Sequence, residues 1–256
     1  MRLVDSHCHL DAPQFNDDRA AVLARARAAG VLQQVVPAIA RAGWPGLRAV
    51  CAEDAGLFPA YGLHPMFLAE HQPDDLDALA DWIVRERPVA VGECGLDHFV
   101  DGLDRQAQAH YFEGQLRLAH AHDLPVIVHA RRAVDAVIAA LKRYDGLRGV
   151  VHSFGGSAEQ ARQLWQRGFM IGLGGPLTYD RARRLHRLAA TMPIEHLLLE
   201  TDAPDQPDSA HRGQRNEPAR LVHVLEAVAR LRGEPPEIVA AHTRDNAARL
   251  FGLSPL

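Results

Sequence analysis

Short apolar runs that fit single β-strands recur eight times along the chain, and longer amphipathic segments separate them. The runs span residues 2–5, 32–37, 58–63, 89–91, 126–128, 150–151, 169–173 and 197–199. In the segments at 17–29, 74–87, 104–122, 133–144, 158–167 and 180–190, apolar positions follow the period of a helix. Strands that alternate with helices in this way restrict the chain to an α/β fold with a parallel sheet.

The apolar runs and the chain length favour a closed barrel. The runs are almost continuously apolar, which indicates strands buried on both faces, and the intervening helices indicate right-handed parallel crossovers. Eight such units in 256 residues average 32 each and leave no strand over. We predict one (β/α)₈ barrel, a TIM barrel, in a single domain over residues 1–256, with two final helices near 218–231 and 235–250. An open doubly wound sheet is the alternative.

Charge and cysteine content narrow the class of protein. The formal net charge of -4 at pH 7 argues against a general nucleic-acid binder, which holds phosphates through a positive surface. The three cysteines form no disulfide framework and indicate a reducing compartment. The N-terminus shows no signal-peptide pattern, and no apolar run approaches the roughly 18 residues that cross a bilayer. We therefore expect a cytoplasmic protein with no membrane contact and no obligate protein partner.

A pair of histidines follows the first apolar run, in the segment Asp5-Ser6-His7-Cys8-His9. Residues i and i+2 of an extended chain point to the same face, so His7 and His9 should both project into the barrel while Cys8 turns outward. Two imidazoles spaced in this way can bind one cation. Asp5 shares their face one step lower, where we expect it to support the histidines rather than to bind the cation.

A carboxylate or an imidazole also ends four of the later strands, at Glu93, His129, His152 and Asp202. The C-terminal ends of barrel strands face one another around the mouth, so these residues should meet there with the two histidines of the first strand. Such a set predicts a metal centre. Six ligands exceed the need of one tetrahedral ion, so we expect two ions about 3.5–4 Å apart. Glu93 is the best candidate to bridge them, because the only lysine, Lys142, lies mid-helix and cannot supply a carbamylated bridge.

Six motifs occur in order along the chain: DSHCHL at 5–10, GLHP at 62–65, GECGLD at 92–97, PVIVHAR at 125–131, VHSF at 151–154 and ETDAP at 200–204. Together they resemble the TatD family of metal-dependent hydrolases over essentially the whole chain. The resemblance implies DNase-like, often exonucleolytic, activity on phosphodiesters. It also implies a binuclear site, in which one ion is held by His7, His9, Glu93 and Asp202 and the other by Glu93, His129 and His152.

Other polar residues near the expected mouth are candidates for substrate binding. His64 ends the third strand and is not needed as a metal ligand, so we predict that it contacts substrate. Arg131 lies two residues past His129 and could donate two hydrogen bonds to a phosphate. Arg212 and Arg215, in the last long loop, are weaker candidates for the same role.

Two positions depart from many members of the family. Asp205 follows the ETDAP motif and His98 follows GECGLD, where many relatives carry Tyr. An added carboxylate near the mouth repels a polyanion, and the sequence shows no basic stripe with interleaved aromatic residues. We therefore expect hydrolysis of short phosphodiesters or 3′ ends, with weak binding of long DNA.

The combined prediction is a divalent-metal-dependent hydrolase that cleaves phosphodiester bonds through a metal-activated hydroxide. Glu93 and Asp202 are the predicted catalytic residues, and Asp202 accepts or shuttles the proton. The substrate is a phosphodiester, in a small ester or in a single-stranded or 3′-terminal nucleic acid. Mixed imidazole and carboxylate ligands favour Zn²⁺ or Mn²⁺, with Mg²⁺ as an alternative. A metal-dependent amide or ester hydrolase, such as an aminoacyl-tRNA deacylase, is the alternative activity.

Overall fold

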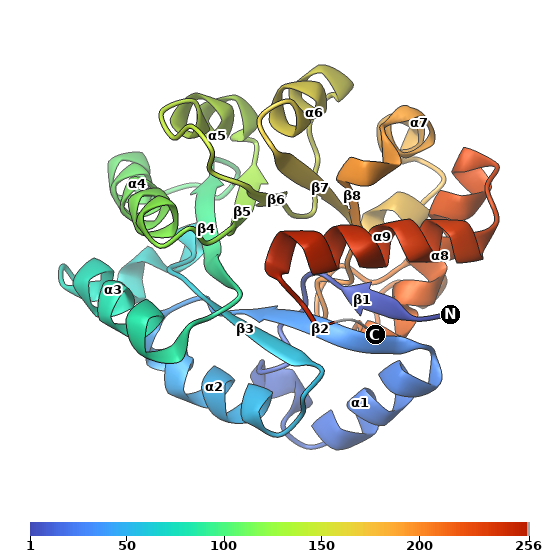
Figure 1. Cartoon of the computed structure of the whole chain (residues 1–256), viewed down its shortest axis with the longest axis horizontal. Coiled ribbons are helices and arrows are strands. Elements are labelled where there is room, and N and C mark those ends of the chain that lie inside the picture. Colours follow the sequence, from blue (N-terminus) through green and yellow to red (C-terminus); the bar gives the residue numbers. More distant parts are fainter. Residues whose placement is uncertain (255–256) are drawn as a thin grey trace.

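Eight parallel strands form one sheet whose order follows the chain (Figure 1). The structure, a computed structural model, describes residues 1–254. The strands are β1 Leu3–Asp5, β2 Val31–Pro37, β3 Leu57–Tyr61, β4 Ala90–Asp97, β5 Val126–Arg131, β6 Gly149–Val151, β7 Phe169–Leu173 and β8 Leu197–Leu199. Each strand pairs in parallel with the strand that follows it. All eight predicted strands are present.

Backbone hydrogen bonds join the last strand to the first and close the sheet. The amide of Ser6, just after β1, donates to the carbonyl of Leu199 in β8 at 3.0 Å. One step further out, the amide of Asp202 donates to the carbonyl of His7 at 2.9 Å. The prediction of a (β/α)₈ barrel is confirmed, and the alternative of an open sheet is wrong because neither edge strand is left free.

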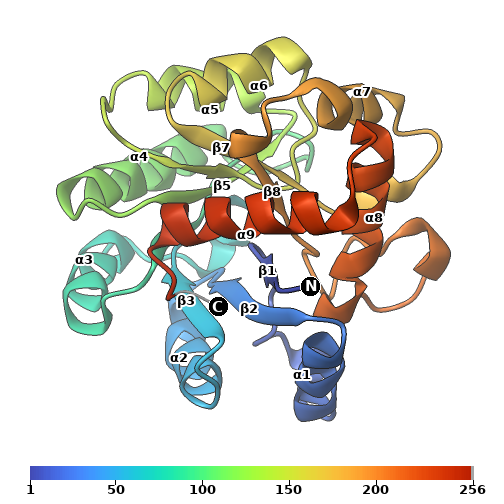
Figure 2. The ribbon, with the colours of Figure 1, turned by 45° about the vertical axis from the view of Figure 1, so that its right-hand side comes forward.

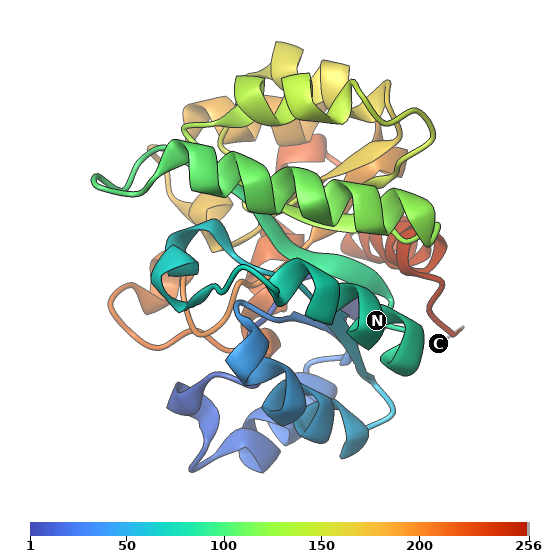
Figure 3. The ribbon, with the colours of Figure 1, turned by 90° about the vertical axis from the view of Figure 1, so that its left-hand side faces the viewer.

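Helices surround the strands and cover the outer face of the barrel (Figure 1 and Figure 3). They are α1 Arg19–Ala28, α2 Trp44–Ala52, α3 Asp75–Glu86, α4 Arg105–Ala121, α5 Val134–Leu141, α6 Ala158–Trp165, α7 Arg183–Thr191, α8 Leu221–Arg232 and α9 Pro236–Phe251. Across residues 1–254, each helix is too short or too polar to span a lipid bilayer.

The last helix closes one end of the barrel. Figure 2 shows α9 lying across the sheet beside β1 and β2. Its buried residues Ala247, Leu250 and Phe251 pack on an apolar layer inside the barrel. Every strand contributes one side chain to this layer: Val4, Val35, Ala60, Ala90, Ile127, Val150, Met170 and Leu198. Because most strands begin at this end, their C-terminal ends open on the opposite side.

Two strands are longer than the apolar runs that predicted them. β4 runs on to Asp97 and β5 to Arg131, so Glu93 and His129 lie within strands rather than after them. The ladder continues because backbone pairing does not depend on apolar side chains, and Gly95 pairs with His129 and Asp97 with Arg131. The result is a pair of strands that carry polar side chains deep into the mouth.

One helix was not identified from the sequence. α2 connects β2 to β3, where the segment contains Gly43, Pro45 and Gly46, residues that weaken a helical pattern. The proline lies in the first turn, where its missing amide hydrogen costs nothing. Burial of Trp44 and Leu47 against the barrel stabilises the helix despite the glycines.

Gln115 of α4 ties that helix to the end of β3. Its side-chain carbonyl accepts from the amide of Leu63 at 2.8 Å, and its side-chain amide donates to the carbonyl of Leu63 at 3.0 Å. The side chain is fully buried, so water cannot replace either bond. This contact fixes the backbone next to His64.

We predict that Gln115→Ala lowers the free energy of unfolding by about 2–4 kcal/mol, because two buried backbone groups lose their partners. Urea denaturation of the purified protein measures the change. Gln106→Ala, at an exposed position of the same helix, is the control and should stay within about 0.5 kcal/mol of the wild type. Equal losses in both variants would contradict the assignment of the two hydrogen bonds.

Candidate metal centre

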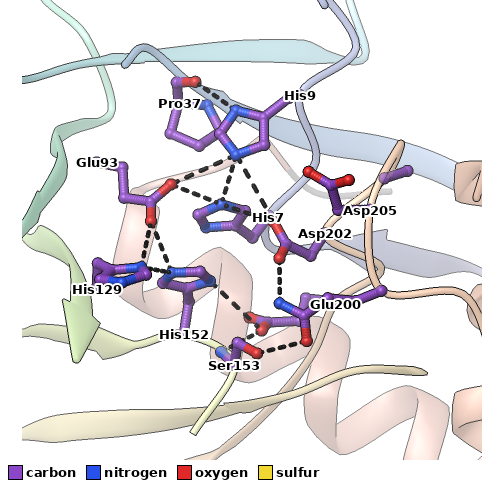
Figure 4. A network of polar contacts seen from close by, with 12 residues as sticks. His7, His9, Pro37, Glu93, His129, His152, Ser153, Glu200, Asp202 and Asp205 are labelled. Atoms are coloured by element: carbon purple, nitrogen blue, oxygen red, sulfur yellow. Dashed lines mark hydrogen bonds and ion pairs between the residues drawn. The ribbon is translucent and has the colours of Figure 1, made fainter. Parts of the chain in front are cut away.

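A cavity of about 1470 Å³ opens at the C-terminal ends of the strands. Segments that follow most of the strands contribute to its wall, as expected for the mouth of a barrel. Seven of the eight predicted site residues line it: His9, His64, Glu93, His129, Arg131, His152 and Asp202. His7 is fully buried and lies at hydrogen-bond distance from Glu93 (Figure 4). The structure therefore brings together side chains from six strands or their C-terminal extensions.

Glu93 is at the centre of this cluster, and five imidazole rings contact its two oxygens. Oε2 lies 3.1 Å from His7 Nε2 and 3.4 Å from His9 Nε2. Oε1 lies near the other three rings, at 2.9 Å from His64 Nε2, 3.1 Å from His129 Nδ1 and 2.7 Å from His152 Nε2. Burial disfavours the ionised carboxylate, but the surrounding histidines outweigh it and hold the pKa of Glu93 well below its usual value. The two oxygens divide the histidines into two groups.

The first group consists of His7, His9 and Asp202. The Nε2 atoms of the two histidines face each other at 3.2 Å, and Asp202 Oδ1 lies 3.4 Å from one and 3.6 Å from the other. On the far side of its ring, His9 Nδ1 lies 3.1 Å from the carbonyl of Pro37. A carbonyl only accepts, so Nδ1 carries a hydrogen and the neutral ring presents a lone pair at Nε2.

His129 is oriented by a carboxylate that the sequence analysis did not single out. Its Nε2 lies 2.9 Å from Asp97 Oδ2, and this contact leaves Nδ1 facing Glu93 and, at 3.4 Å, His152 Nε2. Burial alone would raise the pKa of Asp97, but the hydrogen bond from His129 and those from two backbone amides hold it below its usual value. A carboxylate behind an imidazole is a common support for a metal ligand. In the sequence, the signal for Asp97 was its position four residues after Glu93 in the motif GECGLD.

A second carboxylate that was not predicted, Glu200, lies behind the other side of the cluster (Figure 4). It is fully buried, and burial raises its pKa to about 8. Its Oε1 accepts from the amide of Ser153 and lies 3.8 Å from His152 Nδ1. Ser153 Oγ in turn donates to the side-chain carbonyl of Gln206 at 2.7 Å, and the amide of Gln206 donates to Asp202 Oδ2. This chain of contacts fixes the orientation of Asp202.

His64 has the opposite tautomer from that of His9. Its Nδ1 accepts a hydrogen bond from the amide of Met66 at 3.1 Å. Burial lowers the pKa of His64, so the ring is neutral and its single hydrogen is on Nε2, directed at Glu93. His64, Glu93 and His129 are close enough to hold an ion, but a nitrogen that carries a hydrogen has no lone pair for one. The geometry favours His64 as a hydrogen-bond donor.

The cluster has the properties of a site for positive charge. Burial lowers the pKa of His9 and of His152, yet the charge and hydrogen bonds of Glu93 outweigh it and raise these values to about 9 and about 10. A positive charge between the ring nitrogens and the carboxylate is therefore favoured, and a metal ion competes with protons for that position. The donors are imidazole nitrogens and carboxylate oxygens, which suit divalent transition metals. The residues present fit a metal centre.

The predicted arginines have different positions. The guanidinium of Arg131 lies at the rim of the cavity, 3.7 Å from the centre of the Phe99 ring. Arg215 instead pairs with Asp18 at 2.7 Å, and neither it nor Arg212 lines the cavity. The hypothesis that Arg215 binds phosphate at the mouth is therefore not supported, because its charge is already neutralised.

Comparison with known proteins gives a consistent result over the whole chain. A family model described as TatD related DNase matches residues 4–252. The uncharacterized metal-dependent hydrolase YjjV of Escherichia coli is 41% identical over 255 residues, or 98% of each chain. Its crystal structure superposes with a TM-score of 0.95 at 40% identity and covers 99% of both chains. A protein of Citrobacter rodentium named 3'-5' ssDNA/RNA exonuclease TatD is 35% identical over 98% of each chain.

We predict that Glu93→Gln lowers metal content by at least one ion per chain, because an uncharged side chain cannot balance two cations. His64→Ala should keep its metal, since its Nε2 already carries a hydrogen. Elemental analysis of the purified variants, with their folding checked by circular dichroism, measures both. Equal metal content in the two variants would contradict the different roles of these residues.

We predict that Asp97→Asn weakens metal affinity about 10- to 100-fold, because the neutral amide no longer fixes and polarises His129. Titration of the metal-free protein with Zn²⁺ in competition with a chelating dye gives the affinity. Asp101→Asn removes an exposed carboxylate from the loop that follows β4 and should change the affinity less than twofold. A loss of similar size in this control would show that general charge, rather than the contact with His129, is responsible.

Proposed function

The chain belongs to the TatD-related DNase family of metal-dependent hydrolases, and from this premise we propose that it cleaves phosphodiester bonds at the mouth of the barrel. One observation carries the proposal: five histidines and Asp202 converge around one buried carboxylate, Glu93, at the floor of a wide cavity. The names of two relatives agree with this proposal. The Escherichia coli protein is named a metal-dependent hydrolase, and the Citrobacter rodentium protein is named an exonuclease.

The proposed centre holds two divalent ions. The first would be held by His7, His9, Glu93 and Asp202, and the second by Glu93, His129 and His152. Support comes from the way the two oxygens of Glu93 divide the histidines. We propose Zn²⁺ or Mn²⁺ rather than Mg²⁺, because most of the donors are imidazole nitrogens.

Charge favours an anionic substrate. Glu93, Asp202 and Asp97 supply three negative charges when ionised, and two divalent ions would supply four positive ones, so the filled centre would have a net charge of about +1 before a water is deprotonated. Burial raises the pKa of Glu200 to about 8, which favours its uncharged form near neutral pH. A phosphodiester, which carries one negative charge, suits such a site.

The proposed reaction divides among a few side chains. Bound divalent ions lower the pKa of water and stabilise negative charge on phosphate oxygens. Asp202 accepts the proton of the water whose oxygen attacks phosphorus, and it returns a proton to the oxygen that leaves when the phosphodiester bond breaks. Gln206 and Ser153 hold its carboxylate in place. His64 donates its Nε2 hydrogen to a phosphate oxygen, since Met66 fixes that tautomer. Arg131 contacts substrate from the rim of the cavity.

The substrate class follows from the relatives and from the size of the mouth. The Citrobacter rodentium relative is named for action on single-stranded DNA and RNA from the 3′ end, and we propose the same class for this chain. The cavity exceeds the roughly 300–1,000 Å³ of a small-molecule site, so several nucleotides fit. No observation favours the alternative of an amide or ester hydrolase. The cytoplasmic location expected from the sequence remains part of the proposal.

We predict that the purified protein contains one to two transition-metal ions per chain and loses phosphodiesterase activity when treated with a chelator. Hydrolysis of a single-stranded oligonucleotide, measured alongside elemental analysis, tests both points. Addition of Zn²⁺ or Mn²⁺ to the metal-free protein should restore activity. A metal-free protein with undiminished activity would refute the proposed function.

We predict that Asp202→Asn keeps the fold and most of the metal but lowers kcat at least about 10²-fold, because the proton acceptor is lost. Steady-state kinetics on a protein with measured metal content separates this effect from loss of metal. Glu226→Gln, an exposed change on α8, is the control and should have wild-type kcat. Near-normal turnover of folded, metal-loaded Asp202→Asn would exclude this role.

A further inference from the structure

Two consecutive arginines meet on one phenyl ring at the rim of the cavity. Phe99, in the loop between β4 and α4, is 42% exposed. The guanidinium carbon of Arg131 lies 3.7 Å from the centre of this ring, and that of Arg132 lies 4.6 Å from it. Both arginines line the same cavity as Glu93 and His129. We refer to Phe99, Arg131 and Arg132 as the rim cluster.

The backbone is shaped to bring these side chains together. Consecutive residues of a strand point to opposite faces, so two neighbouring arginines would normally diverge. β5 ends at Arg131, and Arg132 adopts a φ of 52°, in the left-handed region that residues other than glycine rarely occupy. Phe99 is fixed as well, because its amide donates to Asp97 Oδ1 at 2.8 Å.

Neither positive charge of the rim cluster is held in an ion pair by the residues that the structure describes. Among residues 1–254, no ion pair within 4.0 Å links either guanidinium to a carboxylate. The nearest acid along the chain, Asp135, accepts from the side-chain amide of Gln160 at 2.6 Å. By contrast, Arg215 and Arg25 further around the molecule are both paired with acids. Two like charges held side by side, neither of them in an ion pair within 4.0 Å, favour binding of an anion.

The rim cluster is separate from the metal centre. Arg131 lies two residues beyond His129 on β5, which places its backbone about 6–7 Å further out along the strand. Arginine forks match the paired oxygens of a phosphate, and a guanidinium that lies flat on an aromatic ring keeps its hydrogens free at the edges. Arg131 and Arg132 are exposed whereas Glu93 is buried, so an anion bound by the arginines would be a different group from one at Glu93.

We propose that the rim cluster binds a second phosphate of the substrate, next to the one that is hydrolysed. This proposal rests on the proposed function and extends it: the protein prefers a single strand with at least two phosphates over an ester with one. Arg131 and Arg132 bind the phosphate, and Phe99 is a positioning residue for both. The sequence shows no basic stripe with interleaved aromatic residues, because Phe99 lies more than 30 positions from Arg131 in the chain.

The test compares two substrates that differ by one phosphate. Thymidine dinucleotide TpT has a single internal phosphate, and trinucleotide TpTpT has two, with unphosphorylated ends in both. For the metal-loaded wild type, kcat/KM should be about tenfold or more higher for TpTpT, as expected for charge-assisted hydrogen bonds to an added phosphate. Arg131→Ala, Arg132→Ala and Phe99→Ala should each lose most of this advantage, mainly through a higher KM for TpTpT.

Two variants serve as controls. Phe99→Tyr keeps the aromatic ring and should retain the preference for TpTpT. If Phe99 acted only through its size, Phe99→Leu would retain the preference as well. Arg230→Ala removes an exposed charge from the last turn of α8 and should behave like the wild type on both substrates. The proposal is overturned if the rim variants lose TpT and TpTpT activity equally, or if Arg230→Ala lowers the preference as much as Arg132→Ala.

A binding measurement separates this proposal from the proposed function. A six-residue oligothymidylate with phosphorothioate linkages keeps its charge and resists hydrolysis, so its affinity for the metal-loaded protein can be measured without turnover. The slope of log affinity against log salt should fall by about 0.7 for each arginine removed from the rim cluster. An unchanged slope would overturn the second phosphate site. Absence of hydrolysis with a normal slope change would refute only the proposed activity.

Discussion

The buried carboxylate of Glu93 is the constraint on which the rest of the mouth depends. A charge at such a site is costly unless it is paired, and here five imidazoles from four strands or their extensions pair with it. The side chains can reach it because β4 continues past its apolar run and carries Glu93 into the barrel. The compensation requires positive charge, as protons or as metal ions, so the stability of the apo site and its metal affinity are coupled.

Groups outside the cluster decide what each histidine can do. The carbonyl of Pro37 keeps a hydrogen on one side of His9, and Asp97 does the same for His129, so both rings offer a lone pair to the centre. The amide of Met66 has the reverse effect on His64, whose hydrogen points into the cavity. Histidines at the ends of neighbouring strands thus have different chemical roles, because one hydrogen bond to a backbone group or a carboxylate fixes the tautomer of each ring.

The barrel separates the part that provides stability from the part that carries chemistry. At one end, α9 covers an apolar layer to which all eight strands contribute. At the other end, the strand extensions and loops carry the histidines and carboxylates around Glu93 and the two arginines of the rim cluster. Substitutions in the loops after β4 and β8, which carry His98 and Asp205, can therefore change substrate binding without disturbing the apolar layer.

The sequence by itself determined the strand and helix alternation, the closed barrel and the six residues that converge at its mouth, because these follow from local periodicity and from the rule that barrel strands end on one side. It did not reveal α2, since Gly43, Pro45 and Gly46 weaken the helical pattern and only packing of Trp44 on the barrel compensates. Nor did it reveal Asp97 and Glu200 as partners of histidines, or Phe99 as the support of two arginines. Those contacts join residues that lie far apart along the chain, on different strands and loops. Hydrogen bonds and charge pairs between such residues form only when the tertiary structure brings the groups within about 4 Å of each other.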